Sequence, residues 1–208
     1  MTFSEEQARA TLNELGPSDA IERLELLAAE LRSENEKQNL VSRASLQEVW
    51  VRHFADSAQL MRYVPRETRG AWFDLGSGAG FPGLVLAILR RDEPTILIES
   101  RRRRIEWLEA MKVKLDLPNC EIEGKRLEHV ETRKAAVISA RAFAPLPKLL
   151  TLSARFSTER TYWVLPKGRS AAQEVDELPR KLRKMFHVEQ SITDRDAGIV
   201  LGQGKVEA

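Results

Sequence analysis

Hydrophobic residues in this chain fall into two patterns that alternate along its length. Short, uniformly apolar runs are typical of strands that a parallel sheet buries on both faces. Longer segments carry apolar residues three and four positions apart, which predicts amphipathic helices. The alternation therefore predicts an α/β fold, with a mostly parallel sheet and helices on both of its faces. The expected strands lie at 71–73, 95–98, 121–123, 135–139 and 161–165.

The segment before the first apolar run contains helical patterns only. Capping boxes, in which a serine and a Glu or Gln three residues later bond to each other's backbone, predict helices that begin at Ser4 and Ser45. Another helix is expected to begin near Ser18 or Asp19. We therefore predict one compact domain, in which a helical extension over residues 1–69 packs on a Rossmann-like core over 70–208.

The segment after the fifth expected strand predicts one helix and then an antiparallel hairpin. A capping box of Ser170 with Gln173 opens the helix, and its apolar stripe continues toward Lys184. The segments 186–193 and 197–206 flank a short polar turn and are expected to form the two strands of the hairpin.

The stretch from Asp74 to Gly83 connects the first expected strand to an apolar helix. Its glycines carry no Cβ atoms, so the backbone N–H groups at the helix start are open to a polar or anionic ligand. The stretch contains the Gly-x-Gly-x-x-Gly pattern of dinucleotide sites and also the Asp-x-Gly-x-Gly-x-Gly pattern of S-adenosylmethionine enzymes. Glu99, at the end of the second strand, is placed to accept hydrogen bonds from both hydroxyls of a ribose. The residues thus predict a nucleotide-cofactor site and leave both cofactors open.

Composition and charge exclude several classes of protein. A length of 208 residues with 42% hydrophobic content suffices for one α/β domain and a modest extension. The single cysteine, Cys120, excludes an internal disulfide and a multi-cysteine zinc site, and no metal is expected. We expect a cytoplasmic, soluble protein, because no apolar run is long enough to span a membrane and the first residues lack a signal-peptide pattern. The net charge of +2 permits a local basic face without predicting one.

Three groups of charged residues are candidates for function. Arg52, His53 and Asp56 can share one face of a helix, although such a pair of His and Asp is more often a structural hydrogen bond than a catalytic base. Arg141 follows the buried fourth strand, where a charged side chain needs a partner, so we predict a contact with substrate or cofactor. The arginines at 101–104 begin a helix, where the macrodipole disfavours cations, and are offset either by nearby glutamates or by an external phosphate.

Several motifs occur in the order that is typical of one enzyme family. They are Asn39-Leu40, Arg52-His53-x-x-Asp56-Ser57, the turn from Asp74 to Gly83, Ser139-Ala140-Arg141-Ala142-Phe143 and Lys167-Gly168. In these motifs the chain resembles the bacterial 16S ribosomal RNA guanine-N7 methyltransferase family, also called the glucose-inhibited division protein B family. The resemblance implies a class I S-adenosylmethionine-dependent methyltransferase fold with an added N-terminal helical part. It also implies S-adenosylmethionine as cofactor and 16S ribosomal RNA or the small ribosomal subunit as partner, and we expect a monomer.

The resemblance also implies roles for individual residues. Gly76, Gly78 and Phe81 would line the cofactor, whereas Arg141 would reach its methionine end or the target base. The expected cofactor contacts are Asp74, Gly76, Ser77, Gly78, Gly80, Phe81, Glu99, Leu127, Glu128 and Arg141. The expected RNA contacts are Asn39, Arg52, His53, Arg101, Arg102, Arg103, Arg104, Lys167 and Arg169. Guanine N7 has a lone pair and no proton, so it can attack a methyl group without a general base, and Arg141 is the one catalytic candidate.

Two other functions are compatible with the same residues. An NAD-dependent oxidoreductase is favoured by the embedded Gly-x-Gly-x-x-Gly and by Glu99, but the sequence shows no evident catalytic acid for it. A non-catalytic RNA-binding module would keep the fold and bind RNA without taking up the cofactor. Titration with S-adenosylmethionine and with NAD separates these functions.

Overall fold

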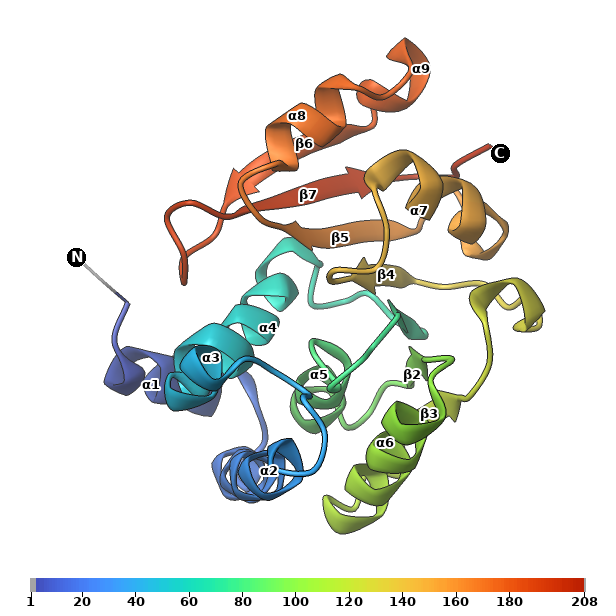
Figure 1. Cartoon of the computed structure of the whole chain (residues 1–208). Helices are drawn as coiled ribbons and strands as arrows, with labels where there is room; N and C mark the ends of the chain where they lie inside the picture. The colour runs from blue at the N-terminus through green and yellow to red at the C-terminus, as the bar shows by residue number, and fades with distance from the viewer. Residues whose placement is uncertain (1–2, 208) are drawn as a thin grey trace.

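The computed structural model describes residues 3–207, which form a seven-stranded sheet with helices on both faces (Figure 1). The strands are β1 (Trp72–Leu75), β2 (Thr95–Ile98), β3 (Cys120–Glu123), β4 (Val137–Ala140), β5 (Tyr162–Lys167), β6 (Phe186–Gln190) and β7 (Gly198–Gln203). Their order in the sheet is β3-β2-β1-β4-β5-β7-β6. Strands β1 to β5 pair in parallel, and β7 is antiparallel to both β5 and β6. The predicted α/β fold and the antiparallel hairpin are confirmed.

The helices divide between the two faces of the sheet. The first group is α1 (Glu5–Leu15), α2 (Ala20–Asn35), α3 (Arg43–Gln47), the π-helix η1 (Trp50–Ala55), α4 (Asp56–Ala58), the 3-10 helix η2 (Gln59–Tyr63), α5 (Gly83–Leu89) and α6 (Arg102–Lys114). The second group is η3 (Leu127–His129), α7 (Leu146–Ser153), η4 (Ala154–Phe156), α8 (Ala171–Asp176) and α9 (Arg180–Arg183). Each group shares a hydrophobic core with its own face of the sheet. In the part of the chain that these elements cover, no helix is long and apolar enough to cross a membrane.

Helix α5 lies at the centre of the first layer. All seven of its residues are buried, because the sheet covers one side and the helices that precede β1 cover the other. This double burial explains why its sequence lacks a polar face. The helical extension and α5 therefore belong to one hydrophobic core, while the division at residues 69 and 70 stays a prediction.

The structure corrects two of the predicted helix starts. The capping box at Ser4 is confirmed, but the expected box at Ser45 is wrong, because Ser42 is the cap and its hydroxyl accepts from the Ser45 N–H at 3.2 Å. Ser170 does precede a helix, yet its hydroxyl donates to the carboxylate of Glu174 instead of capping the backbone. That helix also ends earlier than predicted, since Pro179 separates α8 from α9.

Candidate active site

Two cavities adjoin at the carboxyl edge of the parallel strands. The glycine-turn cavity, about 380 Å³, is lined by the turn after β1, by Glu99 and by Leu127. The hairpin cavity, about 740 Å³, is lined by η1 and α4 on one side and by the loop between β6 and β7 on the other. The segment 141–143 lines both cavities and separates them. A molecule in one cavity would therefore meet a molecule in the other at this segment.

The glycine turn leaves its backbone open at Gly78. Its φ is +56°, which L side chains rarely adopt, and the nearest heavy atom to an added Cβ would be the Gly76 carbonyl oxygen at 3.7 Å. Gly76 differs, because a Cβ there would lie 2.5 Å from the ring of Phe143. Ser77 and Phe81, which we expect to contact the cofactor, also line the cavity. Gly80 does not line it: a Cβ at Gly80 would collide with Leu84 at 2.4 Å, so this glycine permits helix packing.

Asp74 lies elsewhere than we expected. Its side chain is fully buried, with Oδ2 accepting from the Gly83 N–H and Oδ1 from the Ser139 hydroxyl, both at 3.0 Å. Burial raises its pKa to about 6, and the hydrogen bonds from Ser77, Ser139 and Gly83 oppose that shift. The carboxyl group joins β1 to the start of α5 and to β4, and it does not line the glycine-turn cavity. Asp74 positions the turn rather than contacting what the turn holds.

Glu99 lies where the sequence places it, at the end of β2 and on the wall of the glycine-turn cavity. One carboxylate oxygen accepts from the N–H groups of Ser100 and Arg101 at 2.7 and 2.8 Å. The other accepts from the Gly78 N–H at 3.0 Å. Since each carboxylate oxygen has two lone pairs, this second oxygen keeps one for a hydroxyl in the cavity.

The rest of the wall of the glycine-turn cavity includes residues that we did not predict from the sequence. Leu127, an expected cofactor contact, lines it, but Glu128 is exposed and is not among the lining residues. Leu40 and Val41 also line it, although they precede the turn by more than thirty residues. The motif Asn39-Leu40 was the available signal for that contribution. Lys125 completes the wall from the loop after β3.

Arg141 stands between the cavities and is held from the helical layer. Its Nη1 lies 3.5 Å from Asp56 Oδ2, and its Nη2 donates to His53 Nδ1 at 3.2 Å. Because a guanidinium can only donate, His53 Nδ1 must be the acceptor and Nε2 must carry the proton. Burial, with the charges of Arg141 and Arg52, lowers the pKa of His53 to about 3. His53 is therefore neutral and its basic nitrogen is occupied, which argues against its use as a general base.

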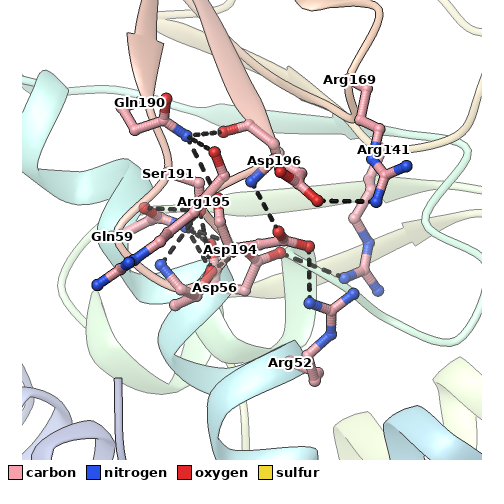
Figure 2. Close-up of polar contacts among 12 residues, drawn as sticks. Arg52, Asp56, Gln59, Arg141, Arg169, Gln190, Ser191, Asp194, Arg195 and Asp196 are labelled. Carbon is pink, nitrogen blue, oxygen red and sulfur yellow. Dashed lines mark hydrogen bonds and ion pairs between the residues drawn. The ribbon is translucent and has the colours of Figure 1, made fainter. Parts of the chain in front are cut away.

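Several predicted RNA contacts are ion-paired within the chain. Figure 2 shows Arg52 bonded to Asp194 and Arg169 bonded to Asp196, each at 2.7 Å. Lys167 is only 11% exposed in its side chain, and it donates to Glu174 at 2.8 Å and to a backbone carbonyl. Lys167 therefore fixes the wall of the hairpin cavity. His53, being buried and neutral, is not a cationic contact for phosphate.

The run of four arginines divides between the site and the solvent. Arg104 donates to the carbonyl oxygen of Asn39, which joins α6 to the segment before α3. Arg101 lines the glycine-turn cavity and is exposed. Arg102 pairs with Glu106 at 2.8 Å, and Arg103 is exposed beside it. Over residues 3–207, no cluster of His, Cys, Asp or Glu could hold a metal ion.

Comparisons with known proteins agree with this geometry. Residues 20–198 match the family model GidB, described as rRNA small subunit methyltransferase G. The chain is 60% identical over 207 residues to the Ribosomal RNA small subunit methyltransferase G of Erythrobacter litoralis, and the match covers all of both chains.

Two solved structures show the fold. The O-methyltransferase TomG of Streptomyces achromogenes, solved with SAM, gives a TM-score of 0.55 at 14% identity, over 85% of this chain and 87% of that one. An RNA methyltransferase of Salinibacter ruber, solved with S-adenosyl-L-homocysteine, gives 0.53 at 14% identity, over 73% and 92%. The predicted class I methyltransferase fold is confirmed by these neighbours.

Proposed function

This chain belongs to the rRNA small subunit methyltransferase G family, and from that premise we propose that it methylates N7 of a guanine in 16S ribosomal RNA. It is a methyltransferase that uses S-adenosylmethionine, as predicted, and not an NAD-dependent oxidoreductase or a non-catalytic module. The observation that carries the proposal is the pair of adjoining cavities, which meet at the segment 141–143. One cavity suits a cofactor, and the other is large enough for a nucleotide.

The residues of the glycine-turn cavity fit S-adenosylmethionine. Gly78 leaves the backbone open, and Glu99 keeps a free lone pair for a ribose hydroxyl. Leu127 would contact the adenine, and Gly76, Ser77 and Phe81 would line the methionine end. The cofactor supplies a methyl group bonded to a positively charged sulfur, and a nucleophile can attack the carbon of that methyl group directly.

The chain needs to position the acceptor rather than to move a proton. Guanine N7 attacks with a lone pair that lies in the ring plane, so no base is required at that atom. His53 matches this requirement, because its lone pair accepts from Arg141 and its pKa of about 3 keeps it neutral. Arg141 lines both cavities and would orient the base at the boundary between them. The walls of the hairpin cavity would exclude water around the base.

We propose that exposed arginines at the start of α6 contact the RNA backbone. Arg101 lines the glycine-turn cavity, and Arg102 and Arg103 follow it as exposed residues of the first helical turn. Cations at a helix start are unfavourable by roughly 0.3–1 kcal/mol each. A phosphate would compensate that cost, whereas Glu106 partners Arg102 alone. Because ribosomal RNA is the proposed substrate, we also propose that the protein acts in the cytoplasm. We further propose that it is a monomer.

The test is methylation of small ribosomal subunits or 16S RNA that lack the modification. The protein and labelled S-adenosylmethionine are incubated with the RNA. The RNA is then digested to nucleosides, which are separated and identified by mass spectrometry. We expect 7-methylguanosine as the labelled product, and expect Arg141→Ala to lose the activity while keeping its fold. A label in another nucleoside, or in protein, would contradict the proposed acceptor.

A further inference from the structure

Recognition of the acceptor base depends on the polar atoms that face the hairpin cavity. We propose that Asp56 and Arg141 together select guanine, with Arg141 donating to O6 and Asp56 accepting from N1–H. This inference rests on the proposed function, because it concerns the base whose N7 is methylated.

The carboxylate of Asp56 is anchored by one of its two oxygens. Oδ1 accepts from the amide of Gln59 at 2.9 Å (Figure 2) and from the hydroxyl of Thr193 at 2.6 Å, so both of its lone pairs are used. Gln59 is itself held, because its amide oxygen accepts from the Ile192 N–H at 3.0 Å. These contacts fix the direction of Oδ2. Asp56 lines the hairpin cavity, and its side chain is 21% exposed.

The second oxygen of Asp56 keeps its capacity to accept. Its distance to Arg141 Nη1 is 3.5 Å, longer than the roughly 3.2 Å limit of a good hydrogen bond. The two groups therefore attract each other without using up the lone pairs of Oδ2. An anchored carboxylate with one free oxygen is suited to receive an N–H group from a planar ring.

Arg141 also has unused hydrogen-bonding capacity. A guanidinium has five N–H donors, and here one is used for His53 Nδ1 and another faces Asp56. The second N–H of Nη1, the nitrogen 3.5 Å from Asp56 Oδ2, is among the donors that remain, on a residue that lines both cavities. A base oxygen bound by Arg141 would thus be close to the boundary with the cofactor.

The donor beside an acceptor matches the edge of guanine. Guanine presents the O6 acceptor next to the N1–H donor, whereas adenine presents an amino donor next to the N1 acceptor, and cytosine has the same reversed order. Uracil shares the order of guanine but has no N7. In guanine, N7 lies on the other side of O6, so a base held by Arg141 at O6 directs N7 toward the cofactor. The pair of Asp56 and Arg141 therefore favours guanine, the one base of the four that has both the O6 and N1–H edge and an N7 nucleophile.

The same contact would strengthen during the reaction. As N7 gains the methyl group, the ring becomes positively charged and N1–H becomes a stronger donor. A hydrogen bond from N1–H to the Asp56 carboxylate is then tighter in the transition state than in the ground state, which is the condition for catalysis by binding. The proton stays on N1, and the sulfur takes the electron pair of the bond that breaks.

The first experiment replaces Asp56 with asparagine and measures methyl transfer to the small-subunit RNA. In Asp56→Asn the amide oxygen can still accept from Gln59 and Thr193, but the amide nitrogen would face N1–H as a second donor. We expect transfer to fall by about 10- to 150-fold, as for the loss of a hydrogen bond to a charged group, with unchanged affinity for S-adenosylmethionine. The matched control is Asp116→Asn, a carboxylate that pairs with Arg23 and Arg91 outside both cavities.

The outcomes separate this inference from the proposed function. If the wild-type protein does not form 7-methylguanosine, the proposed function fails. If the wild type forms it and Asp56→Asn forms it at a similar rate, the inference about Asp56 is wrong. Melting temperature and cofactor affinity of the variant show whether it folds.

A second measurement uses only the wild-type protein, so it does not depend on a variant folding. Nucleoside monophosphates compete with the RNA in the transfer assay. We expect the guanosine and inosine forms to inhibit, because both have O6 and N1–H, and expect the 1-methylguanosine and adenosine forms to inhibit at least about tenfold more weakly. Equal effects of the guanosine and 1-methylguanosine forms, including no effect of either, would overturn the proposal.

Discussion

Replacing His53 with asparagine tests the buried cluster around Arg141 through the pH dependence of stability. The residue is 5% exposed, and burial followed by the charge of Arg141 lowers the pKa of its side chain to about 3. In the unfolded chain the pKa returns to about 6.5. Between these values the unfolded state binds a proton that the folded state does not, so stability decreases as pH falls through 6.5. From pH 7 to pH 5 this effect removes about 2 kcal/mol.

Asp74 acts in the opposite direction over the same range. Its pKa is raised to about 6 by burial, so the folded state binds a proton more readily than the unfolded state does. Lowering the pH from 7 to 5 therefore adds about 1 kcal/mol of stability through Asp74. In the wild type the two effects largely cancel, which hides both of them.

The assay is urea unfolding of the wild type and of His53→Asn at pH 7 and pH 5. Asparagine offers an oxygen near the position of Nδ1, so it can still accept from Arg141. We expect the change in unfolding free energy between the two pH values to differ between the proteins by about 2 kcal/mol. The variant, which keeps only the Asp74 effect, should be more stable at pH 5 than at pH 7 by about 1 kcal/mol, whereas the wild type should change little. Parallel changes in the two proteins would refute the burial of a neutral His53.

Other predictions concern the cofactor, the RNA and Arg141. Gly78→Ala should weaken binding of S-adenosylmethionine in calorimetry, while the unfolding free energy falls by only about 1–2 kcal/mol from the positive φ. The double variant Arg102→Gln with Arg103→Gln should bind RNA with a weaker dependence on salt and with unchanged cofactor affinity. The slope of log K against log salt concentration should become less negative by about 0.7 for each lost contact to a single strand. If the slope does not change, these arginines are ordinary solvent-exposed residues that do not contact RNA. Arg141→Ala should reduce methyl transfer by at least about 100-fold with the melting temperature nearly kept, and near-normal turnover would remove it from the site.

Local patterns in the sequence predicted the parts of the fold that local physics decides. The uniformly apolar runs became strands buried on both faces, and the turn from Asp74 to Gly83 became the wall of a cavity. The start of the third helix was wrong, because Ser42 and Ser45 are both plausible caps by type and only the local geometry selects Ser42. The π-helix that follows has no signal in residue spacing.

Side-chain partners were the part that the sequence could not supply. Arg52 and Asp194 are 142 residues apart, and no pattern in the chain connects them before the sheet brings them together. Asp74 was expected to face the ligand, but its neighbours Ser139 and Gly83 come from different elements and enclose it. For the same reason the sequence predicted the cofactor half of the site better than the hairpin cavity. The first half is built largely from one continuous turn, and the second from distant segments.

The separation of those segments along the chain also sets the order in which the site can assemble during synthesis. Gly78 and Glu99 are 21 residues apart, whereas Asp56 and Thr193 are 137 apart. At about 5–20 residues per second, the ribosome needs roughly 7–27 seconds to pass from Asp56 to Thr193. All residues that line the glycine-turn cavity, the last of them Phe143, are therefore made before the loop that anchors Asp56. Synthesis supplies the proposed cofactor wall first and the anchor of the proposed base-selecting carboxylate last.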